Sequence, residues 1–212
     1  MLPPNAKLSL ITPPTIEPLT LVDAKNYLRI EIDDDALIAD LISAARLECE
    51  HRTGRSFLTT GWRLTLDYLP FGLGSASPLG FALGGASPCG RWADGSLQLP
   101  RPPLIDVTAI SYIDQSGVAA SYDLENLVVS SGSPGRICPI YGGPWHFPLP
   151  KIASVTIDYR AGFGDEPAAV PRNIIQAIRI LTAFYYESRS SDAPIPSVVA
   201  ALLSPSVWPS YG

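Results

Sequence analysis

The hydrophobic pattern of this chain changes period twice, and this change constrains the fold more than any other feature. Apolar residues recur at helical spacing within residues 19–53, alternate with polar residues in short segments between 62 and 160, and return to helical spacing after Pro171. This order predicts an α+β protein. Because the first and last helices are amphipathic and too short to stand alone, we expect them to form one helical bundle with an inserted antiparallel β subdomain.

The N-terminal part carries clear signals for where its helices begin and end. Prolines crowd residues 1–18, which predicts an extended arm. Thr20 and Asp23 resemble a capping box at the start of a short helix. A longer amphipathic helix is expected over residues 33–53, with Gly54 as a left-handed stop.

The middle of the chain has the period of β-strands. Trp62 to Tyr68 alternate apolar and polar side chains, and turn residues between the later candidates favour an antiparallel meander. The stretch 71–95 is rich in Gly, Ser and Pro, contains a ten-residue duplication, and is expected to be a flexible loop. The further strand candidates are residues 96–99, 105–113, 126–130 and 154–160.

The C-terminal part returns to helix. An amphipathic helix is expected after Pro171 and a short one over residues 197–203. The predicted organisation is an extended arm at 1–18, a helical bundle at 19–58 and 165–203, an inserted β subdomain at 59–164 with the flexible loop at 71–95, and a C-terminal tail at 204–212.

Composition excludes several classes of function. The net charge is -5 and the sequence pI about 4.9, so the basic patches of nucleic-acid binders are not expected. No window approaches ~18 apolar residues and no signal peptide is recognisable, which predicts a soluble protein without membrane partners. Cys49, Cys89 and Cys138 lie far apart and are expected to be reduced thiols.

No residue pattern points to chemistry. His51 has Glu48 and Cys49 nearby, but the spacing of a metal site is missing. Asp165 and Glu166 are a carboxylate pair in which helix capping is favoured over acid–base catalysis. The sequence has no Gly-x-Ser-x-Gly elbow and no Gly-Lys-Ser/Thr phosphate loop. We therefore expect no catalytic residue, no cofactor, no metal and no enzyme activity.

Exposed aromatic residues leave an alternative open. Trp145, Phe147 and Trp208 stand among prolines and glycines. Such side chains form sugar platforms or anchor protein interfaces. The alternative function is therefore a β-rich carbohydrate- or protein-binding module.

The motifs, in their order along the chain, resemble a known family. Residues 19–30 (LTLVDAKNYLRI) precede an acidic triplet and a Leu-Ile-x-x-Leu-Ile helix, followed by Arg-Thr-Gly-Arg at 52–55. Later matches are 97–104 (LQLPRPPL), 134–137 (PGRI), 159–164 (YRAGFG), 170–171 (VP) and 185–187 (YYE). From residue 19 to about 205 the chain resembles the head-tail connector, or adaptor, family of long-tailed phages and phage-derived gene transfer particles.

This resemblance implies a structural role. Members of the family form a dodecameric ring in the particle neck, below the portal protein and above a stopper or tail-completion protein. DNA passes through the channel without specific binding, and the protein is made in the cytoplasm of the bacterial host. An acidic wall suits such a channel, because clustered Lys and Arg would hold phosphates. We expect the free chain to be a monomer or small oligomer that closes its ring on the portal.

The C-terminal segment 194–212 is the expected portal attachment. Its prolines prevent one continuous helix, and it carries many apolar groups for a solvated tail. The sequence predicts that it adds little to the fold of the free subunit, although closure of the bundle by residues 197–203 is the alternative. The tentative portal-binding residues are Val198, Val199, Leu202, Leu203 and Trp208.

Overall fold

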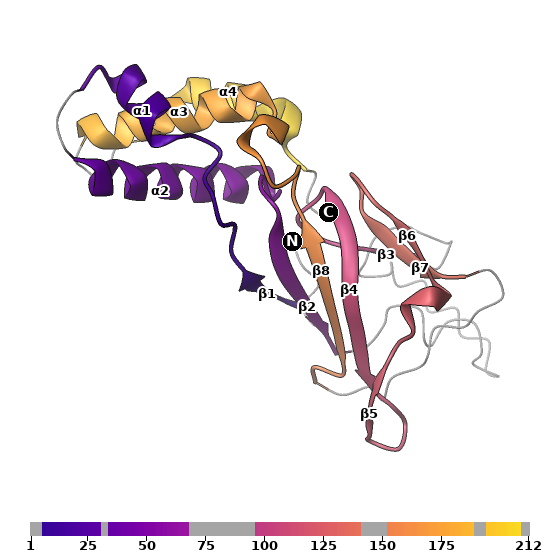
Figure 1. Cartoon of the computed structure of the whole chain (residues 1–212). Coiled ribbons are helices and arrows are strands. Elements are labelled where there is room, and N and C mark those ends of the chain that lie inside the picture. The colour runs from indigo at the N-terminus through magenta and orange to yellow at the C-terminus, as the bar shows by residue number, and fades with distance from the viewer. Residues whose placement is uncertain (1–5, 31–33, 68–95, 141–151, 189–193, 209–212) are drawn as a thin grey trace. The chain divides into compact units, whose positions relative to one another are not determined.

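The computed structural model describes residues 6–30, 34–67, 96–140, 152–188 and 194–208. These residues form two compact units, a strand unit from residues 1–13 and 60–161 and a helical unit from residues 14–59 and 162–208. The described ranges contain four α-helices and two antiparallel sheets, which confirms the α+β class (Figure 1). None of the helices in these ranges is long and apolar enough to cross a membrane. The predicted loop at 71–95 lies outside the described residues.

Four α-helices build the helical unit, and α3 packs against the other three. They are α1 (Leu21–Leu28), α2 (Asp35–Thr53), α3 (Arg172–Ser188) and α4 (Ser197–Leu203). Their apolar stripes meet in one core because each helix is amphipathic. Its fully buried members include Ile38, Ile42, Ala45, Ile174, Ala177, Ile178 and Leu181.

The predicted helix ends are confirmed by their hydrogen bonds. The Asp23 amide donates to Thr20 Oγ1 at 3.1 Å, and the Thr20 hydroxyl donates to the Asp23 carboxylate at 2.8 Å. At the end of α2, Gly54 has φ +67° and its amide donates to the Glu50 carbonyl at 2.9 Å. The left-handed conformation there favours glycine because it has no Cβ.

The strand unit contains two sheets with one shared core. The five-stranded sheet has the order β1 (Ala6–Thr12), β2 (Thr60–Leu66), β8 (Val155–Ala161), β4 (Leu104–Ile113) and β5 (Ala119–Ser121). The second sheet has the order β3 (Leu97–Gln98), β7 (Arg136–Pro139) and β6 (Leu127–Ser130). All pairs are antiparallel, as expected, but the predicted simple meander is wrong because β2 and β4 both pair with β8.

Burial along the strands follows the two-residue period. In β8 every second residue from Val155 to Ala161 is buried, and the residues between them are partly or fully exposed. The exposed face carries two cross-strand ion pairs: Arg63 donates to both oxygens of Asp158, each at 2.7 Å, and Arg160 pairs with Asp106. The alternation read from the sequence therefore separates core from surface in this unit.

The expected N-terminal arm is extended, but residues 6–12 are a strand of the sheet. They form β1 and pair with β2 from Ala6 opposite Leu66 to Thr12 opposite Gly61. The reason lies in where the prolines stand: they flank residues 5–12 without interrupting them, so the amides between them remain able to donate. Sequence reasoning also missed β5 and β7.

A close backbone approach explains one of the family-like motifs. Gly162, in the YRAGFG segment, has φ +146°, and a Cβ placed there would lie 2.3 Å from the Leu58 carbonyl oxygen. The Phe163 amide next to it donates to the Phe57 carbonyl at 3.1 Å. Only glycine fits this position without displacing the residues 57–58.

We expect Gly162→Ala to lower the free energy of unfolding by about 3 kcal/mol or more, because the new methyl group meets backbone atoms that cannot rotate away. Gly117→Ala is the matched control: Gly117 also has positive φ, but a Cβ there meets nothing within 4 Å. Chemical denaturation of both variants measures the difference. Equal losses would contradict the close-approach explanation.

Candidate interaction surface

The five residues predicted to bind a partner do not form one exposed surface. Val199 and Leu203 are 0% and 1% exposed and belong to the core of the helical unit. Leu202 is partly buried against the same core, whereas Val198 is 47% exposed. The expectation that this segment adds little to the fold is therefore wrong. A seven-residue helix places Val199 and Leu203, four positions apart, on the same face, and that face packs on α3.

Polar contacts also hold the C-terminal segment to α3. The Asn173 side-chain amide donates to the Leu202 carbonyl at 2.9 Å and to Ser206 Oγ at 3.2 Å. Ser206 belongs to a 3₁₀ turn, Ser204–Ser206, that follows α4 directly. The predicted tail 204–212 therefore begins as an ordered part of the helical unit.

Trp208 is anchored to the end of α2. Its amide donates to the Thr53 carbonyl at 2.7 Å, and its ring centroid lies 5.4 Å from the Arg55 guanidinium. Arg55 Nε also donates to the Ser206 carbonyl at 2.6 Å. The guanidinium stacked over the indole supplies a cation–π contact, so this tryptophan is engaged within its own unit. Among the exposed residues of this segment, Val198 and Val207 are apolar, and Ser197 and Ser204 are polar.

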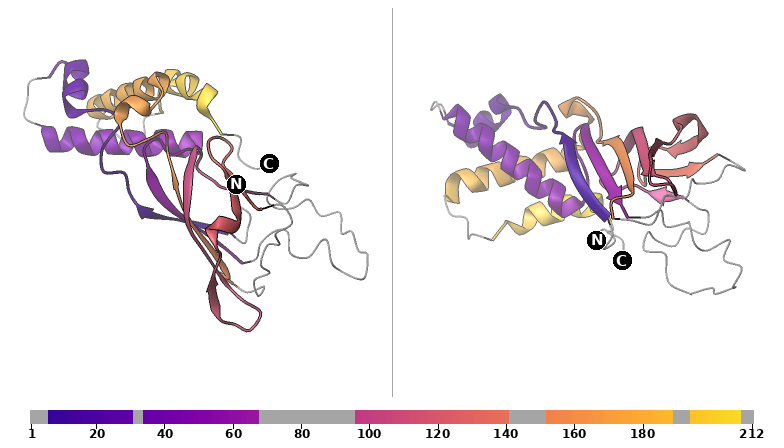
Figure 2. Two further views of the ribbon diagram at one scale, coloured as in Figure 1. Left: turned by 45° about the vertical axis from the view of Figure 1, so that its right-hand side comes forward. Right: turned by 90° about the horizontal axis from the view of Figure 1, so that it is seen from below.

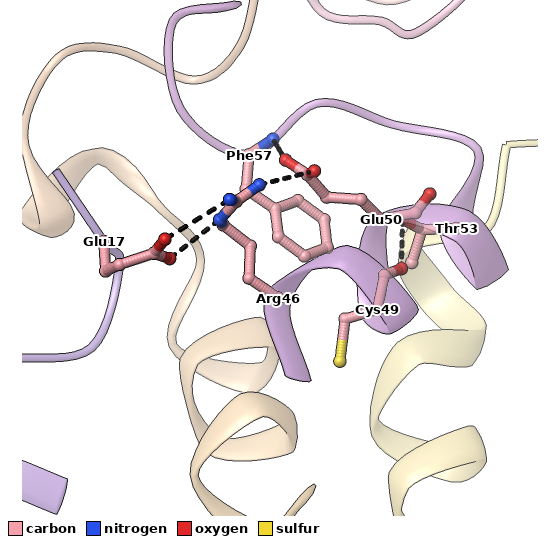
Figure 3. Close-up of polar contacts among 6 residues, drawn as sticks. All are labelled: Glu17, Arg46, Cys49, Glu50, Thr53 and Phe57. Atoms are coloured by element: carbon pink, nitrogen blue, oxygen red, sulfur yellow. Dashed lines mark hydrogen bonds and ion pairs between the residues drawn. The ribbon is translucent and has the colours of Figure 1, made fainter. Parts of the chain in front are cut away.

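A buried charge network ties together three segments of the helical unit (Figure 3). Arg46 on α2 donates from Nε and Nη2 to the two carboxylate oxygens of Glu17, at 2.7 and 3.2 Å. Its Nη1 donates to Glu50 at 3.0 Å, and the other Glu50 oxygen accepts the Phe57 amide at 2.8 Å. Arg46 and Glu50 are each only 7% exposed. Burial alone would lower the pKa of Arg46, but its two carboxylate partners outweigh burial and raise the pKa.

Cys49 lies next to Glu50 on α2, in the core of the helical unit. It is completely buried, and burial raises the pKa of its thiol to about 12. The thiolate is the nucleophilic form, so this cysteine stays protonated at neutral pH.

Two adjoining grooves lie on the helical unit and share Thr20 and Pro167. The larger, about 620 Å³, has a polar wall from α3 formed by Arg172, Gln176 and Arg179. Arg179 donates to Gln176 Oε1 at 3.0 Å, so part of this wall is already paired internally. The smaller, about 380 Å³, is apolar and lined by residues from 16–21 and by α2. Open grooves with mixed walls suit contact with another protein chain.

The residues considered for chemistry remain apart. Among the described residues, no three His, Cys, Asp or Glu side chains gather as a metal site would require. His51 is exposed on α2. Glu166 is the N-cap of the 3₁₀ turn Pro167–Ala169 and makes no side-chain capping bond. Trp145, Phe147 and Cys89 lie outside the described residues.

Sequence reasoning missed the charge network. The spacing of Arg46 and Glu50, four residues apart on a helix, was a readable signal for their ion pair. Glu17 lies twenty-nine residues before Arg46 in the chain, and no local sequence pattern predicts a contact between them.

The chain shares its fold with chains of gene transfer agent particles. It is 24% identical to a chain in the neck of an empty particle computed with sixfold symmetry, with a TM-score of 0.72 and 94% of each chain covered. A chain in the virion of a native particle is 25% identical, with a TM-score of 0.71 over 93% of each chain. A chain in the neck of a native particle computed with twelvefold symmetry is 24% identical, with a TM-score of 0.65 over 94% of each chain.

No protein-family model and no curated protein matches the sequence. The likeness to gene transfer agent structures confirms the resemblance predicted from the ordered motifs.

We expect Arg46→Met to lower the free energy of unfolding by about 3–5 kcal/mol, because it leaves Glu50 buried without its cationic partner. Arg52→Met is the matched control, since Arg52 pairs with Glu48 at the exposed surface of the same helix and contributes at most about 1 kcal/mol. Denaturant unfolding measures both. Similar losses for the two variants would contradict a dominant role of the buried network.

We expect Leu203→Ala to cost about 2–5 kcal/mol, because it opens a cavity in the core of the helical unit. Val198→Ala, on the exposed side of the same helix, should change stability by less than about 0.5 kcal/mol. Thermal melts of the two variants report the difference. If Leu203→Ala has the same melting temperature as the unchanged protein, α4 does not close this core.

Proposed function

We propose that this chain is a structural head-tail connector in the neck of a phage or phage-like particle, joining the portal protein to the stopper or tail-completion protein. The observation that carries the proposal is the likeness to gene transfer agent necks over 94% of the chain at a TM-score of 0.72. A likeness that spans both units concerns the whole architecture rather than one recurrent motif. The family motifs support the same assignment.

The two units have the organisation expected of such a connector. The helical unit is a bundle of N- and C-terminal helices, and most of the strand unit is an insertion between them, to which β1 adds a strand from before the first helix. Residues 60–161 separate the two segments of the helical unit along the chain, which supports this description. The portal, stopper and neighbouring copies would then contact one folded subunit through different surfaces.

The symmetry of the similar particles supports assembly of this chain into a ring. The two necks were computed with sixfold and twelvefold symmetry, which fits copies of one chain arranged around an axis. The net charge of -5 suits a channel wall that DNA passes without binding. In this proposal the protein has a structural role in the neck and is not an enzyme.

The portal contact involves the outward side of the C-terminal segment. Val198 and Val207 are exposed there, whereas Val199 and Leu203 close the core behind them. The exposed Val198 and Val207 therefore belong to a segment that is held in place by its buried side, which suits residues that anchor an interface.

Deleting the gene in a host that produces the particles tests the proposed function. We expect DNA-filled heads without tails, together with free tails, and recovery of tailed particles when the unchanged gene is returned. Electron microscopy and transfer of packaged DNA measure the outcome. Normal tailed particles from the deletion strain would overturn the proposal.

A further inference from the structure

In the part of the chain that the structure describes, the edge strands of the strand unit are β1 and β5 in the five-stranded sheet and β3 and β6 in the three-stranded sheet. β1 ends the five-stranded sheet and pairs there only with β2, while β6 ends the three-stranded sheet and pairs only with β7. Figures 1 and 2 show β1 and β6 on opposite sides of this unit. An open edge presents amides and carbonyls that another strand can pair with.

The β1 and β6 edges both expose aliphatic side chains, although β1 also carries the exposed Lys7 and a register irregularity between Leu10 and Thr12. Leu10 and Ile11 on β1 are exposed, and so are Val128 and Val129 on β6. Charges, prolines or bulges near the centre of an edge strand normally hinder its pairing with another chain. Exposed, β-branched or aliphatic edges of this kind favour pairing with a further strand.

The register of β6 shows which of its backbone groups face outward. The Ile140 amide donates to the Asn126 carbonyl at 3.0 Å, so residues 126 and 140 form a hydrogen-bonded pair. Bonded and non-bonded pairs alternate in an antiparallel ladder, so Val128 is turned towards β7 and Val129 away from it. The amide and carbonyl of Val129 therefore point to the open edge.

The charges beside the two edges are of opposite sign. Lys7 lies on β1 and is exposed, while Asp123 and Glu125 stand exposed just before β6. Opposite charges favour contact between the two edges over contact of either edge with its own copy. Two different, complementary surfaces on opposite sides of a subunit give a head-to-tail contact, and such contacts form a ring when the rotation from one copy to the next closes the circle.

We infer that the β1 edge of one copy pairs with the β6 edge of the next, which joins the subunits of the ring through a continuous backbone ladder. The occupant of each edge is thus a second copy of this chain. This inference rests on the proposed function, because the ring exists in the particle neck.

Cross-linking in purified tailed particles tests the contact. The particles contain the chain with Cys89 and Cys138 replaced by serine and with Leu10→Cys, Val128→Cys or both, and are treated with a short bismaleimide. We expect the double variant to give a ladder of covalent multimers on a denaturing gel. Each single variant should stay monomeric, because the contact joins two different edges.

Several outcomes overturn the inference, and they remain distinguishable. If the chain is absent from tailed particles, the proposed function fails as well. If the chain is present but the double variant gives no ladder, only the edge contact is wrong. Dimers from a single variant would indicate that like edges meet, which also contradicts the inference.

A backbone substitution gives an independent test. Val129→Pro removes an outward-pointing amide and leaves the bonds to β7 intact. We expect at least about fivefold fewer tailed particles, because the loss of one hydrogen bond, about 1 kcal/mol, weakens each subunit contact about fivefold. Ala119→Pro, at the outer edge of β5, is the matched control and should leave the yield unchanged.

Both variants must melt within a few degrees of the unchanged protein for the comparison to hold, and circular dichroism measures this. If Val129→Pro fails that criterion, the cross-linking result alone decides. Equal yields from folded Val129→Pro and Ala119→Pro variants would contradict pairing at the β6 edge.

Discussion

The helical unit depends on the buried cation of Arg46, which pairs with the buried Glu50 and the partly exposed Glu17. Arginine stays protonated in proteins, so burying Arg46 without partners would cost the helical unit several kcal/mol. Glu17 and Glu50 offset that cost by pairing with Arg46. The network therefore fixes on α2 the segment that precedes α1 and the turn that follows α2 itself.

The C-terminal segment has two sides with different roles. Val199 and Leu203 complete the core on α3, and the contacts of Trp208 with Thr53 and Arg55 extend that attachment to the end of α2. The exposed Val198 and Val207 then stand on a rigid base. A segment that is already ordered in this way loses little conformational entropy when it binds a partner, which strengthens binding without new contacts.

Much of the fold could be predicted from local patterns, and the failures have physical causes. The helical spacing of apolar residues in α2 and α3 and the helix caps at Thr20 and Gly54 depend only on residues close together in the chain, so they could be predicted from the sequence. β1 was missed because flanking prolines dominate its composition, although the pairing residues between them are free to donate. The burial of Val199 and Leu203 depends on the position of α3, which no spacing within residues 194–212 specifies. The Arg46–Glu17 pair is a long-range contact of the same kind.

The central claim is that this chain forms part of a particle neck. A reconstruction of the neck of particles from the producing host tests it most directly. The account predicts density below the portal that fits both the helical and the strand unit of this chain, repeated around the axis. A neck whose density is filled by other proteins, with no position for this fold, would contradict it.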